Sequence, residues 1–184
     1  MSAGAAKALT SSALQSHFEL FGLPAAFGLD QEALEQAYRE IQSRVHPDRF
    51  AHAGDAERRA SLQWTTRVNE AYRALKDPVQ RGKHLLELHG VDVAFETNTQ
   101  MPSDFLLQQL ELREELESAT GKKDASRLER LRSGLRSQEQ GLERQIATAI
   151  DTRKDYAGAA ELVRKLMFLD RLDAEIDAAY EEIE

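Results

Sequence analysis

The chain has 184 residues, 41% apolar and 30% charged, which is the profile of a soluble, helix-rich protein. Residues 1–90 carry 11 basic and 11 acidic side chains, whereas residues 91–184 carry 13 and 21, so the whole net charge of −8 lies in the second half. This distribution disfavours general nucleic-acid binding and suits a basic protein partner. Because there is no cysteine, disulfides, thiolate zinc sites and directly ligated iron–sulfur clusters are excluded.

Residues 1–15 are small and polar, with one lysine and no arginine. They lack the apolar core of a secretory signal and are poorly basic for a mitochondrial presequence, so we expect a disordered tail. No stretch of the sequence approaches the ~18 apolar residues of a membrane span, so no membrane partner is expected.

Two helices are predicted before the dipeptide His46-Pro47. The segment SHFELFGLP predicts a short helical turn that ends at Gly22. Asp30 is a good N-cap for the next helix. That helix should end near His46, because a residue before proline is disfavoured in the α region. Its apolar residues recur at helical spacing and predict one buried face: Leu34, Ala37, Tyr38, Ile41 and Val45.

A polar loop from Asp48 to about Gly54 should lead into a third helix that stops at Asp77-Pro78. A fourth helix, VQRGKHLLELHG, should end at Gly90, a plausible position just beyond a helix C-terminus. The third helix carries Leu62, Val68, Ala71, Tyr72 and Leu75. Residues 16–90 therefore predict a compact four-helix domain whose middle two helices are antiparallel.

Residues 91–102 break the helical periodicity and predict a linker. Ser103 or Asp104 can cap a helix that stops at Gly121, a long helix should start near Lys123, and a last one near Tyr156. The seam of the long helix comprises Leu128, Leu131, Leu135, Leu142, Ile146 and Ala149, and that of the last helix Leu162, Leu166, Leu169, Ile176 and Tyr180. Residues 103–184 thus predict an antiparallel three-helix bundle in an all-α chain.

The tripeptide His46-Pro47-Asp48 does not belong to a recognisable enzyme site. The sequence has no phosphate-binding glycine loop, nucleophile elbow or H-E-x-x-H motif, so no enzyme activity is predicted. Two simple explanations remain beside a functional one. The tripeptide could merely stop the helix, or His46 could meet His52 across the loop at a zinc site, although no carboxylate pattern completes such a site.

The surroundings of the tripeptide are more specific. The preceding helix carries Tyr38 and Ile41, and the segment VNEAYRALKDPVQR follows the polar loop. This ordered set, over about residues 16–90, resembles the J domain of DnaJ-type co-chaperones. The resemblance implies a domain that binds a DnaK-type chaperone and stimulates its ATPase without supplying a catalytic group.

The resemblance also implies which residues meet that chaperone. Asp48 offers a carboxylate to an arginine of the partner, His46 offers a donor, and Pro47 fixes the loop. Basic residues of the preceding helix and the loop contribute as well. The predicted chaperone-binding residues are His46, Pro47, Asp48, Arg39, Arg44 and Arg49.

The helix FLLQQLELREELESA has more leucine than one buried face needs. Phe105, Leu112 and Leu116 share a face at 100° per residue, whereas Leu106, Leu107 and Leu110 lie elsewhere, beside Glu111 and Glu114. Contact with the other helices, or with the first domain, would explain these leucines. The alternative is an exposed apolar patch with acidic neighbours that binds a protein. In VRKLMFLDRL, Met167 likewise falls nearly opposite the core stripe, and Phe168 about a quarter-turn off.

The stretches QLELREELE and VRKLMFLDRL, behind a J domain, resemble the HscB (Hsc20-like) family of J-type co-chaperones of bacterial iron–sulfur cluster assembly. HFELFGLP and LLELHGVD fit this family too. The resemblance implies that the C-terminal bundle binds the cluster scaffold, IscU-like, while the J domain engages a specialised HscA-like chaperone. One acidic position of the family falls on Ser118 here. The implied scaffold-binding residues are Leu106, Leu107, Leu110, Glu111, Glu114 and Phe168.

The expected function is therefore that of a cytoplasmic, bacterial-type co-chaperone, monomeric and without a cofactor, which delivers the scaffold to the chaperone and promotes cluster transfer. Two alternatives stay open. The chain could be a J protein for another client, or a structural helical adaptor with a vestigial J-like hairpin. Stimulation of the chaperone's ATPase separates the adaptor from both co-chaperone functions.

Overall fold

The computed structural model describes residues 16–50, 54–93 and 101–183. These residues form helices and connecting turns without any strand, as the sequence predicts. The chain divides into two compact units, Met1–Leu88 and His89–Glu184. No helix of the described residues is long and apolar enough to cross a bilayer. The predicted tail, residues 1–15, lies outside the described residues, as does most of the predicted linker.

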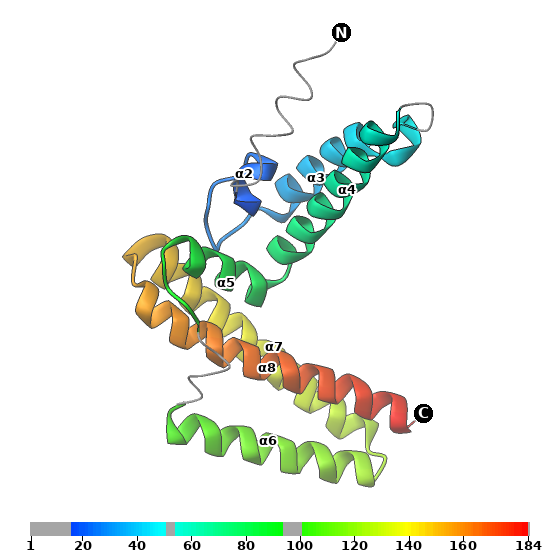
Figure 1. Ribbon diagram of the computed structural model, residues 1–184. Coiled ribbons are helices and arrows are strands. Elements are labelled where there is room, and N and C mark those ends of the chain that lie inside the picture. The colour runs from blue at the N-terminus through cyan, green and yellow to red at the C-terminus, as the bar shows by residue number, and fades with distance from the viewer. Residues whose placement is uncertain (1–15, 51–53, 94–100, 184) are drawn as a thin grey trace. The chain divides into compact units, whose positions relative to one another are not determined.

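The first unit is built on the antiparallel hairpin of α3 (Gln31–Val45) and α4 (Asp55–Lys76), shown in Figure 1. The short helix α2 (His17–Phe21) packs against both of them, and α5 (Pro78–Leu88) packs against α4. All four elements contribute side chains to the core. Its largest fully buried side chains are Phe18, Leu34, Leu75, Leu85 and Leu86.

Local signals fix the helix ends of the first unit. The Asp30 side chain accepts hydrogen bonds from the backbone N–H groups of Glu32 and Ala33, so the predicted N-cap is confirmed. Gly22 follows α2 with a left-handed φ of 65°, and Gly90 follows α5 with φ 72°. Glycine suits both positions because this region of backbone space costs it little.

The corner between α4 and α5 is held by the buried Arg81. Its Nη1 donates to the backbone carbonyl of Leu75 at 2.6 Å, so a side chain satisfies a carbonyl in the last turn of α4. The guanidinium also lies 4.8 Å from the ring centroid of Phe27, a cation–π contact. These contacts stabilise a charged side chain that would otherwise be costly to bury.

The second unit comprises α6 (Ser103–Gly121), α7 (Ala125–Ala147) and α8 (Tyr156–Ile183). A π-helical turn, η3 (Thr148–Arg153), extends α7 before the chain reverses into α8. Leu128, Leu131 and Leu135 of one predicted seam meet Leu169 and Ile176 of the other in one core. Its buried members are Leu116, Ala119, Leu128, Leu131, Leu135, Leu169, Leu172, Ile176 and Ala179.

Two residues at the start of the second unit, His89 and Val93, contact α8. Val93 is buried, and its carbonyl accepts a hydrogen bond of 3.1 Å from Nη1 of the buried Arg164. The ring of His89 stacks on Tyr156 with 3.9 Å between the centroids. The second unit therefore includes residues that sequence periodicity alone does not assign to the bundle.

Several local predictions were wrong. The N-cap of α6 is Pro102, without a side-chain cap, rather than Ser103 or Asp104. The predicted polar loop begins as a 3-10 turn, η2 (Pro47–Phe50). Leu62 is 55% exposed on α4, away from the core, and Met167 is buried although the helical wheel of α8 placed it opposite the core stripe.

Candidate protein-binding sites

The His-Pro-Asp corner is attached to both helices of the hairpin. The carbonyl of Val45, the last residue of α3, accepts hydrogen bonds from the Ser61 hydroxyl at 2.6 Å and the Thr65 hydroxyl at 3.3 Å, both on α4. Helix C-termini leave carbonyls without intrahelical partners, and α4 satisfies this one. The residue that follows, His46, therefore projects from a fixed backbone.

His46 and Asp48 form a small hydrogen-bonded turn. The Asp48 N–H donates to His46 Nδ1 at 3.3 Å, and the Asp48 carboxylate lies 3.5 Å from the same nitrogen. Because Nδ1 accepts in the turn, Nε2 is the ring donor that stays available to a partner. The Asp48 side chain is 91% exposed, so its carboxylate can accept a bidentate pair of hydrogen bonds from an arginine.

The basic residues of the predicted chaperone surface lie near this corner in sequence. Arg39 is exposed on α3 and pairs with Glu35 at 2.8 Å, one helical turn away. Arg44 is exposed in the last turn of α3. Of Pro47 and Arg49 the structure describes the backbone alone, within η2. Between Arg39 and Asp48 the chain thus offers guanidinium donors and a carboxylate acceptor, the groups that recognise a charged partner.

The zinc alternative gains no support in the part of the chain that the structure describes. No group of three or more histidine, cysteine or acidic side chains able to hold a metal ion occurs among the described residues, and His52 lies outside them. His17 and His84 do meet, with stacked rings 4.1 Å apart, and His84 Nε2 accepts the backbone N–H of His17. Burial lowers the pKa of His84 to about 4, which makes this pair a neutral packing feature.

On α6, three leucines form an exposed row. Leu106 is 44% exposed, Leu107 58% and Leu110 54%, whereas Leu116 on the opposite face is buried. This arrangement contradicts the alternative in which other helices cover these leucines. Glu111 and Glu114 are exposed on the same helix. An apolar patch with acidic neighbours is the arrangement that the protein-binding hypothesis requires.

Phe168 connects this row with α8. It is half-buried, and its ring meets that of Phe105 edge to face, with 5.9 Å between the centroids and an interplanar angle of 75°. The Lys165 ammonium lies 5.7 Å from the centroid of the Phe105 ring. Phe168 therefore packs against the first turn of α6, the turn that also carries Leu106 and Leu107.

Sequence periodicity missed one residue of α6. Gln109 lies on the core face, is 2% exposed, and has no hydrogen-bond partner for either amide atom among the described residues. Its spacing from Phe105, Leu112 and Leu116 places it on their face, and this spacing was the available signal. Ser118, where the resemblance implies an acidic position, is half-buried near the end of α6.

Comparison with known proteins agrees with this geometry over nearly the whole chain. The chain is 50% identical over 169 residues to the protein named Co-chaperone protein HscB homolog from Burkholderia mallei, covering 92% of this chain and 96% of that one. The chain belongs to the HscB co-chaperone family. The family model described as HSCB C-terminal oligomerisation domain matches residues 101–177.

Solved HscB structures have the same fold. The chaperone HscB from Vibrio cholerae is 33% identical, with a TM-score of 0.80 over 92% of this chain and 100% of that one. Human co-chaperone protein HscB is 26% identical, with a TM-score of 0.85 over 91% of this chain and 83% of that one. The predicted fold class, a J domain followed by a helical bundle, is confirmed by these HscB neighbours.

Proposed function

We propose that this HscB-family chain binds an IscU-like iron–sulfur cluster scaffold, delivers it to an HscA-like DnaK-type chaperone and stimulates that chaperone's ATPase. The observation that carries the proposal is the 50% identity to a co-chaperone HscB homolog over 92% of the chain. Two exposed features support it, the His46–Asp48 corner and the leucine row of α6. The chain acts as a monomer in the bacterial cytoplasm and supplies no catalytic group.

At the chaperone surface, His46 and Asp48 act by recognition. Asp48 accepts from an arginine of the chaperone, His46 donates through Nε2, and the fixed end of α3 holds both in place. Arg39 and Arg44 add positive charge that attracts an acidic surface and orients the encounter. Docking favours the conformation of the chaperone that hydrolyses ATP.

At the scaffold surface, Leu106, Leu107 and Leu110 bury apolar area against the partner, at about 25 cal/mol per Å² of area removed from water. Glu111 and Glu114 pair with basic side chains of the scaffold at the rim. Phe168 supports the row from α8 and contributes its exposed edge. Binding to this surface raises the local concentration of the scaffold at the chaperone.

The experiment that tests the proposal is a steady-state ATPase assay of the chaperone with the full-length chain, with and without the scaffold. The His46→Gln variant should lose stimulation by tenfold or more while its circular dichroism spectrum and scaffold affinity stay unchanged. His46 caps α3 from an exposed position, so core packing does not depend on it. Full stimulation by the variant would contradict the proposed role of the corner.

The same assay separates the alternatives. A J protein for another client would stimulate the chaperone but show no scaffold binding in a titration, whereas a structural adaptor would do neither.

A further inference from the structure

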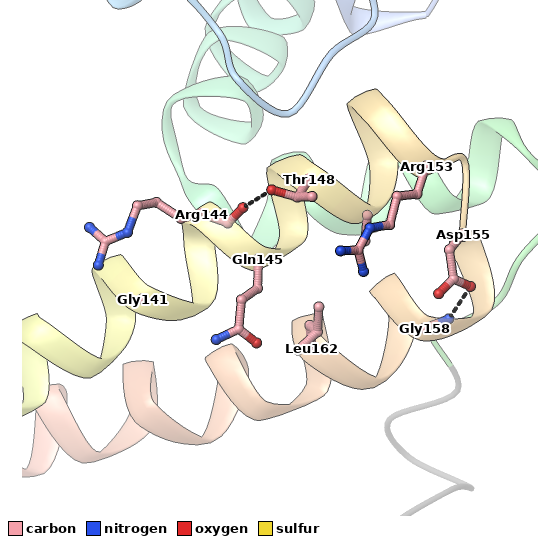
Figure 2. A pocket seen from close by; sticks show the side chains of 9 residues that line it. Gly141, Arg144, Gln145, Thr148, Arg153, Asp155, Gly158 and Leu162 are labelled. Atoms are coloured by element: carbon pink, nitrogen blue, oxygen red, sulfur yellow. Dashed lines mark hydrogen bonds between the residues drawn. The ribbon is translucent and has the colours of Figure 1, made fainter.

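A cleft of about 560 Å³ lies in the second unit where α7, η3 and the start of α8 meet (Figure 2). Its volume falls within the range of small-molecule sites. Ala149 and Leu162 provide apolar surface, and the other lining side chains are polar or charged. The residues that line this cleft lie between positions 141 and 162, so none of them belongs to the proposed chaperone-binding or scaffold-binding surface.

Two arginines line this cleft, Arg144 and Arg153, and Gln145 lies between them in Figure 2. Both are exposed, and neither guanidinium forms an ion pair with another described residue. Residues 91–184 carry a net charge of −8, so these two arginines place positive charge beside the cleft within an acidic unit. They offer several N–H donors to an anionic ligand.

The nearby carboxylate of the lining is already engaged. Asp155 Oδ1 accepts the backbone N–H of Gly158 at 2.9 Å, which caps the start of α8. A Cβ atom at Gly158 would collide with this carboxylate, so the glycine keeps the cap in place. Asp155 is therefore held toward α8, as Figure 2 shows, and its hydrogen bond is directed to the backbone.

The π-helical turn is what brings Arg153 to the cleft. Arg144 and Thr148 lie one α-helical turn apart, and the Thr148 hydroxyl donates to the Arg144 carbonyl at 2.9 Å. In a continued α-helix, the residue five positions after Thr148 would be rotated about 140° away from it. A π turn closes over five residues, so Arg153 returns toward the face of Thr148 and Arg144.

The backbone around this turn has a second unusual conformation. Lys154 adopts a left-handed φ of 57°, which a residue with a Cβ atom rarely does. The Asp155 N–H donates to the Ala149 carbonyl at 2.9 Å and closes the turn. Strained conformations and π turns are concentrated at functional sites, because they persist where the surrounding structure fixes them.

From the cavity, the unpaired arginines and the π turn we infer that this cleft binds a small anion through its phosphate or carboxylate oxygens. Arg144 and Arg153 donate to separate anionic groups or to the two ends of one ligand. The side-chain amide of Gln145, which also lines the cleft, can supply further N–H donors. The planar guanidinium of arginine can donate two parallel hydrogen bonds to two oxygens of either a tetrahedral phosphate or a planar carboxylate.

The test is isothermal titration of the full-length chain at low ionic strength with inorganic pyrophosphate and, separately, with citrate. Binding of one anion alone identifies phosphate or carboxylate as the recognised group, and binding of both identifies a general oxyanion site. Arg153→Gln and Arg144→Gln should each weaken binding at least about tenfold, because a charge-assisted hydrogen bond is lost. If neither anion binds, the inference is wrong.

Two further variants separate a defined site from general attraction to charge. Gly141→Leu adds no charge and has open space for its side chain, since a Cβ at Gly141 meets nothing within 4 Å, so it should block the cleft and abolish binding. Arg130→Gln makes the same charge change as Arg153→Gln on an exposed part of α7 and should leave binding unchanged. Equal weakening by Arg130→Gln and Arg153→Gln, or normal binding by a folded Gly141→Leu variant, would overturn the inference.

Discussion

Helices α6 and α7 belong to the same bundle and are similar in length, yet they use leucine in different ways. In α7, Leu128, Leu131 and Leu135 repeat on one face, and all three are buried. In α6, Leu106, Leu107 and Leu110 are exposed, while a polar residue, Gln109, occupies the core face. In these two helices a leucine is therefore buried when it continues the periodic stripe, and the α6 leucines off the stripe are exposed.

The largest expected effect is a difference in folding stability between the two kinds of leucine. Leu135→Ala should lower the free energy of unfolding by about 2–5 kcal/mol, because it leaves a cavity in the core. Leu107→Ala and Leu110→Ala should each change it by less than about 0.5 kcal/mol, because both side chains are largely exposed. Chemical denaturation of the three variants measures this difference.

The same variants should behave in the opposite way toward the scaffold. Titration with the scaffold should show binding weakened at least about tenfold by Leu107→Ala or Leu110→Ala, since each truncation removes apolar area that the proposed interface would bury. Phe168→Ala should reduce both stability and binding, because Phe168 is half-buried against Phe105. If the exposed leucine variants lose stability in step with binding, the proposed interface must be abandoned.

Gln109 offers a way to make α6 more like α7. A buried amide without a hydrogen-bond partner costs about 1–3 kcal/mol. Gln109→Leu should therefore raise the free energy of unfolding by about 1–2 kcal/mol in denaturant titrations. Gln108→Leu, an exposed neighbour on the same helix, is the matched control and should have little effect. A destabilised Gln109→Leu variant would instead show that the amide is satisfied in solution.

Glu139 is a charged residue within the otherwise apolar seam of α7. Burial, followed by repulsion from Asp173, Asp170 and Glu143, raises its pKa from 4.5 to about 7, and Arg136 opposes the shift. The folded state thus holds a proton that the unfolded state loses more readily. Wild-type stability should fall as the pH rises from about 4.5 to 7, and remain at the lower level above that range.

The Glu139→Gln variant tests this pH dependence. Glutamine carries no charge, so the variant should gain about 1 kcal/mol over the wild type above pH 7 and lose this advantage near pH 4.5, with solvent screening limiting the effect. Thermal melts at several pH values across this range would reveal it. A difference between the two proteins that does not vary with pH would refute the raised pKa.

Much of the fold could be predicted from sequence because its signals are local. Asp30 caps α3, Pro47 ends it, and Gly22 and Gly90 follow helices in the left-handed conformation that glycine allows. The exposed leucines of α6 could be found by the same helical geometry. These positions depend on the few residues beside them in the chain.

The features that sequence reasoning missed depend on distant contacts. Met167 is buried because α8 packs on more than one neighbour and therefore buries more than one stripe, as the buried Arg164 also shows. His17 and His84 stack across 67 positions of sequence, which no local pattern indicates. The π turn after α7 has no distinctive residue pattern, and neither does the cleft beside it.

The smallest expected effect concerns the acidic residues beside the leucine row. Glu111 and Glu114 are exposed, so they should contribute mainly by attracting a basic partner during association. The double variant Glu111→Gln, Glu114→Gln should slow association with the scaffold several-fold at low salt, and the difference should fade as salt screens the charges. The rate of dissociation should change little. Stopped-flow measurements at increasing salt concentration separate the two rates.

The matched control for this last prediction is Glu181→Gln, Glu182→Gln, two exposed residues at the end of α8. It makes the same change in net charge away from the α6 row. Equal slowing by both double variants would mean that the overall negative charge of the second unit, rather than the rim of the leucine row, steers the scaffold. Slower association by the α6 variant alone would place the first encounter on the helix whose leucines face outward, in contrast to the buried seam of α7.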